Sequence, residues 1–375
     1  MPTGLIPLRD VDAALAARWR ELADGALEPN PYAHPDFVLP AARRLPGGAE
    51  VGMLFAESRG ELRFALPVAR IRRLRGLPVH AAGTWLHPYC FLGTPLLSPA
   101  DPEASWAQAL DTLAGTAPFG VLGAFGSDGE VAAALAGVLA SRRRRETRLR
   151  GWDRPVLHAV DGAAGVLTMS SSRRGDLRRR RRKLGEALGG TPEYVVHTAP
   201  GPDLDRAVDG FLATERSGWK GHDGGAMACH PGHDEFFREM CRRFAAAGNL
   251  RLRSLGVGPR VAAYECSLAA GRWLFGFKMT YDEELRRYGP GVALVADVMT
   301  EFLADLRHDT YDSCTGTEVT IAHELFPGRR AVSDLLLPLP GLLGRVAAPA
   351  LPGAVAASRR VKRLGRAALA WGSGG

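Results

Sequence analysis

One short run in this 375-residue chain has the composition and spacing to bind a pyrophosphate through its backbone. The run RRYGPG (286–291) is followed by an apolar face at helical spacing, as expected of a glycine turn that opens a helix. Unpaired N–H groups and the positive end of the helix dipole attract phosphate oxygens, and glycines let these oxygens approach closely. We therefore predict a pyrophosphate site made by Arg286, Arg287, Tyr288, Gly289, Gly291 and Val292.

The same run also has a purely structural interpretation. A glycine turn joins a strand to a helix in many α+β domains, and Pro290 has no N–H group to donate. Its position favours the phosphate site, because three strand-like runs, 250–257, 260–270 and 272–281, come before it in hairpin-like succession. A long amphipathic helix and a further strand are expected after it.

The rest of the sequence predicts two mixed α/β halves that hold this loop. Helices are expected near 10–25, 103–115, 173–184, 203–219 and 234–248, and strands near 51–57, 62–71, 84–97, 119–125 and 194–198. In the basic helix 173–184 we expect Leu177 and Leu184 to anchor one face while the arginines stay solvated. The charges of the arginine-rich run 141–150 cannot be buried, so we place the boundary between two domains there. We predict domains over 1–150 and 151–335, followed by a proline-rich segment and basic tail over 336–375.

The second half resembles the CelD/BcsL-like branch of the GNAT acetyltransferases. The matching stretches are SSSRRGDLRRRRRKL (170–184), FLATERSGWKG (211–221), VAAYECSL (261–268), WLFGFKMTYDEELRRYGPGVAL (273–294) and YDSCTGTE (311–318). This branch is related to the Fem-type aminoacyltransferases, which have duplicated GNAT folds and a similar basic helix. The resemblance implies an α+β chain of tandem GNAT-like domains, each a mostly antiparallel sheet flanked by helices. It also implies acyl transfer to a nucleophile, usually an amine.

Direct acyl transfer needs a base for the acceptor amine and a proton source for the leaving thiolate. Glu215, Trp219 and Lys220 fall within a resembling stretch. The other candidates lie close to the glycine loop in sequence or on the helix after the next strand. We predict catalytic roles for Glu215, Lys278, Tyr281, Glu318 and His323, and acceptor-binding roles for Trp219, Lys220 and Asp282.

Several of these candidates have a structural alternative. Trp219 could be a core aromatic, and Glu215 a surface charge. Strict alternation along the strand LFGFKMTY would turn its phenylalanines inward and Lys278 outward. A lone histidine such as His323 is often structural.

Composition argues against several other classes of protein. With 46% hydrophobic and 23% charged residues, the chain is expected to be globular. Five cysteines without a C-x-x-C pair argue against a disulfide framework or a zinc cage. A cluster of His222, His230 and His233 lacks the usual metal-site spacing, so we expect no metal. Neither a signal peptide nor an uninterrupted apolar span is found, and we expect a cytoplasmic protein.

The net charge of +8 is concentrated in three stretches, 142–150, 173–183 and 359–366. These stretches are either solvated helix faces and domain edges or contacts to an anionic partner. The last stretch could lie on a membrane surface as a short amphipathic helix, which would give a peripheral membrane contact.

Three functions follow from these patterns. The leading hypothesis is an N-acyltransferase that moves an acyl group, expected to be acetyl, from acyl-CoA to a small-molecule amine or an amine-bearing acceptor. The first alternative is a Fem-type aminoacyl-tRNA-dependent aminoacyltransferase, in which 173–183 contacts tRNA phosphates. The second is a non-catalytic binder of anionic partners, although no helix-turn-helix, zinc-finger or RNP pattern supports sequence-specific nucleic-acid binding. The acceptor and the oligomeric state stay open.

Overall fold

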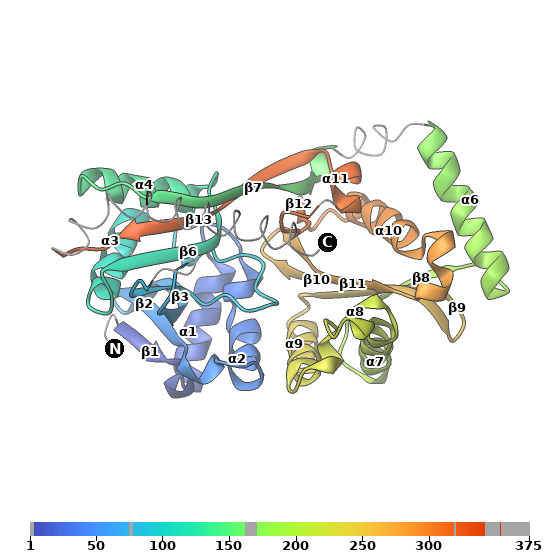
Figure 1. Cartoon of the computed structure of the whole chain (residues 1–375), viewed down its shortest axis with the longest axis horizontal. Helices are drawn as coiled ribbons and strands as arrows, with labels where there is room; N and C mark the ends of the chain where they lie inside the picture. Colours follow the sequence, from blue (N-terminus) through green and yellow to red (C-terminus); the bar gives the residue numbers. More distant parts are fainter. Residues whose placement is uncertain (1–3, 75–77, 162–170, 319, 342–352, 354–375) are drawn as a thin grey trace, which may run out of the picture. The chain divides into compact units, whose positions relative to one another are not determined.

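The computed structural model describes residues 4–74, 78–161, 171–318, 320–341 and 353, and the chain divides into two compact units (Figure 1). Unit 1 comprises 1–33, 50–152 and 331–375, and unit 2 comprises 34–49 and 153–330. The segment 34–49 therefore belongs to unit 2 although it comes early in the sequence. The predicted tail stretch 359–366 lies outside the described residues.

Unit 1 is a mostly antiparallel sheet with helices packed on it. Its strands follow the order β1-β2-β3-β4-β6-β13, with β5 paired to β3 and only β4 and β6 parallel. The strands are β1 (Gly4–Pro7), β2 (Gly52–Ser58), β3 (Glu61–Ile71), β4 (Ala81–Thr84), β5 (Leu96–Leu97), β6 (Phe119–Gly126) and β13 (Gly328–Pro338). The helices are α1 (Ala13–Asp24), α3 (Pro102–Ala114) and α4 (Glu130–Ser141). Trp106 of α3 is fully buried against Phe64 and donates its indole N–H to Val131 O at 3.1 Å.

The predicted strand over 84–97 is a loop for most of its length. Pro88 and Pro95 cannot donate to a sheet ladder. The loop is held instead by the buried amide of Asn30, whose Nδ2 donates to Leu92 O at 3.1 Å and to Thr94 O at 2.6 Å.

The strand order continues from β13 into the mostly antiparallel strands of unit 2, β7-β12-β11-β10-β9-β8, in which β11 and β12 are parallel. Its strands are β7 (Thr147–His158), β8 (Glu193–His197), β9 (Leu250–Val257), β10 (Arg260–Ala270), β11 (Trp273–Tyr281) and β12 (Thr310–Asp312). The chain passes between the units within β7, after Trp152, and within β13, after Arg330. The arginine-rich run enters β7, where alternation buries Leu149 and exposes Arg148 and Arg150.

Helices cover both faces of the unit 2 sheet (Figure 1). The helices α7 (Pro202–Ser217), α8 (Trp219–His222) and α9 (His233–Ala246) lie on one face, and α2 (Pro35–Arg44) packs on α9. The opposite face carries α10 (Pro290–Ala304), with α6 (Ser171–Leu188) beside it and the short α11 (Ile321–Leu325). Leu294, Val298 and Phe302 recur at four-residue spacing on α10 and are almost fully buried, which explains why this segment packs as a helix.

The basic helix α6 packs through Leu184, as predicted, together with Leu188, whereas Leu177, the other predicted anchor, is outside the buried core. Leu184 is fully buried, Leu177 is half-buried, and Arg178 and Arg182 are exposed. Arg181 reaches across to Asp297 of α10 and to the carbonyl of Pro192. The α+β class, with mostly antiparallel sheets flanked by helices, is confirmed. None of the helices in the described ranges combines the length and apolar character needed to cross a bilayer.

Candidate active site

The strands β11 and β12 separate in the middle of the unit 2 sheet and leave a cavity of about 240 Å³. They pair in parallel only from Trp273 opposite Thr310 to Phe275 opposite Asp312. On its other edge, β11 has a bulge at Phe277, because Cys266 pairs with Lys278 and Ser267 with Gly276. A bulge bends its strand. The cavity begins where β11 turns away from β12, and it is lined by 276–279, 313–315, Val295 and Val298 of α10, parts of α11, Glu265 and Tyr311.

The bulge turns two consecutive side chains toward the face that carries α7 and α9. Phe277 contacts Phe37 of α2 and stacks on Phe237 of α9. Lys278, the next residue, places Nζ 2.6 Å from Oε1 of Glu215 on α7. Alternation alone would have placed these two neighbours on opposite faces.

Glu215 and Lys278, both predicted site residues, form a buried ion pair. Glu215 is 1% exposed, and its second oxygen accepts from Met227 N at 2.8 Å. The Lys278 side chain is 12% exposed and also lines the cavity. A fully buried carboxylate is costly without a partner, so Glu215 holds the ammonium of Lys278 at the cavity wall.

His233 lies near enough to Lys278 for the lysine charge to act on it, although the sequence suggested it only as a metal ligand. It is the first residue of α9 and is 7% exposed. Burial lowers the pKa of His233, and the positive charges of His230 and Lys278 lower it further. The imidazole is therefore neutral near pH 7 and able to accept a proton. No sequence spacing relates His233 to Lys278, so only the fold could reveal their proximity.

The predicted glycine loop opens α10 as expected. The Asp282 carboxylate accepts from Glu284 N at 3.0 Å and starts a 3₁₀ turn over Glu283–Tyr288. Gly289 follows in the left-handed conformation (φ 63°), and its N–H donates to Arg286 O at 2.9 Å. Because Pro290 has no N–H, the amides available at the helix start are those of Gly291 and Val292.

The side chains of Tyr281, Met279 and Arg180 lie around the two glycines at the start of α10. A Cβ on Gly291 would lie 3.4 Å from Cδ1 of Tyr281 and 3.5 Å from Cε of Met279, and Met279 also lines the cavity. Arg180 of α6 lies over Gly289, with Nη1 3.1 Å from the position of a Cβ there, and its Nε donates to Asp176 at 2.7 Å. The loop thus has a cation beside it and a continuous path of contacts to the cavity.

The other predicted site residues differ in how exposed they are and in what they contact. Arg286 and Arg287 are exposed, and the Arg287 guanidinium lies 4.7 Å from the ring centroid of Tyr288. Burial and the nearby Glu283 raise the pKa of Tyr281. Trp219 is 56% exposed at the start of α8, and the side chain of Lys220 lies outside the described part of the structure.

Two predicted catalytic residues come after β12. Glu318 is exposed. His323 is part of a capping box, in which its Nδ1 accepts from Thr320 N at 3.0 Å and so stabilises the start of α11. Among the described residues, no group of three or more His, Cys, Asp or Glu side chains is arranged to hold a metal ion.

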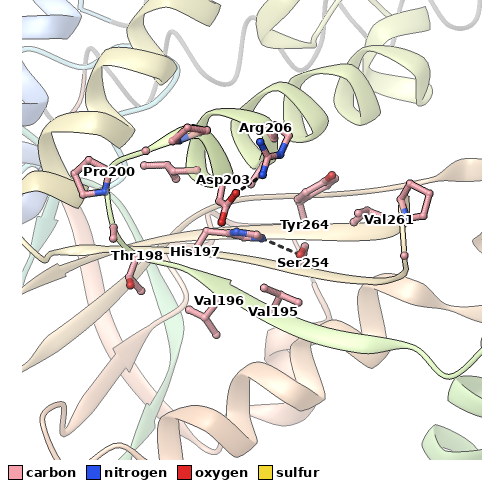
Figure 2. Close-up of a pocket in the computed structure, with 17 residues that line it drawn as sticks. Val195, Val196, His197, Thr198, Pro200, Asp203, Arg206, Ser254, Val261 and Tyr264 are labelled. Carbon is pink, nitrogen blue, oxygen red and sulfur yellow. Dashed lines mark hydrogen bonds and ion pairs between the residues drawn. The ribbon is translucent and has the colours of Figure 1, made fainter.

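A larger cavity of about 900 Å³ lies at the N-terminal end of α7, at the other end of this helix from Glu215 (Figure 2). His197 of β8 and Ser254 of β9 meet there, with Nε2 and Oγ 3.1 Å apart, below the first turn of α7. Burial lowers the pKa of His197 against the opposing charge of Asp203. None of the predicted site residues lines this cavity.

Comparisons with known proteins agree with this geometry. Residues 171–319 match the model of the acetyltransferase (GNAT) domain family. Among solved structures, FemX aligns at 8% identity with a TM-score of 0.56, covering 87% of this chain and 96% of its own. The C-terminal domain of a putative lysylphosphatidylglycerol synthetase from Agrobacterium fabrum aligns at 10% identity with a TM-score of 0.55, covering 89% and 94%.

L-PGS from Bacillus licheniformis aligns at 11% identity with a TM-score of 0.53, covering 96% of this chain and 98% of its own. At these identities the likeness concerns the fold, and it extends over both units, as the predicted tandem arrangement requires. No curated protein matches the chain. The part of the chain that matches the acetyltransferase (GNAT) domain family, residues 171–319, contains the diverging strand β11, the glycine loop and α10.

Proposed function

We propose that the chain is an N-acyltransferase that moves an acyl group from acyl-CoA to an amine by direct attack. The observation that carries the proposal is the connection between the start of α10 and the cavity beside β11. Met279 packs against Gly291 at one end of this path and lines the cavity at the other. A long, thin donor with a pyrophosphate at one end and a thioester at the other matches such a site.

The residues present fit this donor. The free amides of Gly291 and Val292, with Arg180 close by, suit the pyrophosphate. The cavity walls from 276 to 279 and from 313 to 315 suit the arm that leads to the thioester. The same proposal assigns binding of the pyrophosphate at the outer side of the loop to Arg286, Arg287 and Tyr288.

The chemistry follows from the charges beside the cavity. The amine nitrogen attacks the thioester carbonyl and gives its proton to neutral His233. The Lys278 ammonium, held by Glu215, stabilises the negative charge that develops on the carbonyl oxygen. The C–N bond forms, the C–S bond breaks, and the thiolate takes up a proton, with Tyr281 as a candidate donor. Trp219, Lys220 and Asp282 are proposed to contact the acceptor, and an acyl-CoA donor favours a cytoplasmic reaction.

Two experiments test the proposal. Calorimetry measures the binding of CoA and acetyl-CoA, and a free-thiol assay then measures turnover with a panel of primary amines. We expect CoA to bind and thiol release to require an amine. Absence of CoA binding to the folded protein would contradict the donor assignment.

A second function is favoured by the exposed arginines of α6. Arg178, Arg179 and Arg182 face solvent beside the glycine loop, and an aminoacyl-tRNA donor would bring phosphates to this side. Consumption of charged tRNA in the same assay, without any thiol release from acetyl-CoA, would select this function over the first.

A further inference from the structure

The larger cavity at the N-terminal end of α7 holds a serine and a histidine that the proposed transfer reaction does not use. Ser254 Oγ and His197 Nε2 lie 3.1 Å apart, and both residues line this cavity of about 900 Å³ (Figure 2). Asp203, another lining residue, lies about 18 Å from Glu215 along the axis of α7, at a rise of about 1.5 Å per residue. The cavity is therefore separate from the transfer site.

Strand register brings the polar side chains of this cavity together. Val195 of β8 is opposite Ser254 of β9, and Ser254 is opposite Tyr264 of β10. His197 comes two residues after Val195, so its side chain lies on the same face of the sheet, diagonally across from Ser254. Three neighbouring strands thus present one imidazole and two hydroxyl groups to the same cavity.

His197 is suited to take the proton of Ser254. Burial lowers the pKa of His197, so the imidazole is neutral near pH 7 and its Nε2 can accept the serine hydrogen. The Asp203 carboxylate acts in the opposite direction and favours the imidazolium. Nucleophilic catalysis by a serine needs a base of this kind, which is neutral at rest and is stabilised once it is protonated.

The hydroxyl group of Tyr264 lacks a partner. Tyr264 is 6% exposed and lines the cavity, and within the described residues its hydroxyl makes no hydrogen bond. Burial raises the pKa of Tyr264, so the hydroxyl stays protonated and can donate. A buried hydroxyl without a partner costs free energy. The carbonyl oxygen of a bound molecule can supply that partner.

The other lining residues indicate an uncharged substrate. Asp203 and Arg206, both largely exposed, pair with each other, so together they leave no net charge. Much of the remaining lining is apolar and comes from Val195, Pro200, Pro202, Pro259 and Val261. Such a lining fits a short hydrocarbon chain beside a few polar groups.

We propose that this cavity is a second active site, in which Ser254 and His197 hydrolyse short, uncharged carboxylic esters. Ser254 Oγ attacks the carbonyl carbon while His197 Nε2 takes the serine proton. The bond from the carbonyl carbon to the alcohol oxygen breaks, and the alcohol leaves with that proton. The product of this step is an acyl-serine. Tyr264 donates to the carbonyl oxygen, on which negative charge develops.

Water completes the reaction. A water molecule attacks the carbonyl carbon of the acyl-serine and gives one proton to His197. The bond between this carbon and Ser254 Oγ breaks, and His197 returns the proton to the serine. The carboxylic acid is released, so one ester and one water give one acid and one alcohol. No acyl-CoA takes part, and the site is independent of the proposed transfer reaction.

A fluorescent fluorophosphonate tests the proposal, because it phosphonylates serines that a neighbouring base activates. Labelling of the full-length protein, followed by peptide mass spectrometry, is expected to place the label on Ser254. Hydrolysis of p-nitrophenyl butyrate measures turnover at the same site. We expect Ser254→Ala to abolish both reactions, and His197→Gln to slow both by about 10²-fold or more, as loss of a general base does.

A second pair of a histidine and a hydroxyl provides the matched control. His158 Nδ1 and Thr310 Oγ1 lie 3.2 Å apart, but neither residue lines this cavity. His158→Gln should therefore leave labelling and hydrolysis unchanged. Thermal melts identify any variant that fails to fold, and the position of the label in the wild-type protein is decisive without them.

The outcomes separate this site from the transfer site. Absence of label on Ser254 in the folded wild-type protein would overturn the proposal. So would labelling at an unchanged rate in His197→Gln, or hydrolysis that persists in Ser254→Ala. CoA binding and thiol release should be the same before and after Ser254 is labelled, so their absence from the unlabelled protein would contradict only the transfer reaction.

Discussion

The ion pair between Lys278 and Glu215 is the most informative contact at the scale of single residues. Both charges are removed from water, and neither would be stable there without the other. Such a pair fixes the direction of the ammonium as well as its charge. The structural cost of removing Lys278 must therefore be separated from its chemical role.

We predict that Lys278→Met lowers kcat by roughly 10²-fold, as removal of an oxyanion donor does, while CoA affinity changes little. The variant also leaves Glu215 buried without its partner, which should cost about 3–5 kcal/mol of stability. The double variant Lys278→Met/Glu215→Gln should recover stability but not kcat, measured by denaturation and thiol release. Lys183→Met, at an exposed position, is the matched control. Recovery of kcat in the double variant would reduce the pair to a packing role.

The pH dependence of the reaction should report His233. Its pKa is lowered below the usual 6.5, so the base is neutral at pH 7 and becomes protonated only at more acidic pH. We expect kcat/KM to fall as pH decreases through a value below 6.5, and His233→Gln to remove this acid limb. Because the folded-state pKa is lowered, protonation of His233 should also reduce stability in the same direction.

His323→Gln is the comparison that can contradict this assignment. His323 stands at the third position of the capping box of α11, where glutamine is a regular residue, so the variant should keep its stability and leave the acid limb in place. If the limb disappears with His323 instead, the base lies after β12 and not on α9.

At the scale of secondary structure, the start of α10 depends on the absence of a side chain at Gly291. A Cβ there would be in van der Waals contact with Met279 and Tyr281, and a valine would extend further into the path of the donor. We predict that Gly291→Val weakens CoA binding at least about tenfold and preserves the fold, measured by calorimetry and circular dichroism. Gly175→Val, where a Cβ meets open space, should bind CoA normally. Unchanged affinity in Gly291→Val would remove the pyrophosphate from this loop.

The basic helix α6 should owe its position to leucines and not to arginines. Leu184 is completely buried, so Leu184→Ala should lower the free energy of unfolding by about 2–5 kcal/mol. Arg182→Ala, which removes an exposed pair with Glu186, should cost less than about 1 kcal/mol. Chemical denaturation compares the two variants, and similar costs would mean that ionic contacts hold the helix.

At the scale of the whole molecule, the net charge of +8 bears on the choice of donor. A tRNA engages many phosphates and releases many counterions, so its binding should weaken steeply between low and moderate salt. CoA offers few phosphates to a loop of mostly neutral amides, so its affinity should change much less. We predict the shallow dependence for the functional donor. Turnover that falls by several orders of magnitude over the same salt range would favour the tRNA reaction.

The sequence by itself determined the features that depend on local order. Hydrophobic spacing located α10, turn residues separated β9, β10 and β11, and the glycine run marked the start of a helix. Leu184 could be assigned to the core because the arginines on the rest of α6 need water. These features follow from backbone geometry and from hydration, which act over a few residues.

The tertiary structure decided which distant groups meet. Alternation suggested that Lys278 could face solvent, but helices cover both faces of the sheet, so a side chain on either face meets protein. The bulge at Phe277 then turned Lys278 toward Glu215. Glu265 and His233 reached the site through strand pairing and helix packing across many residues. Such contacts depend on register and on the order of strands, and no local pattern in the sequence specifies either.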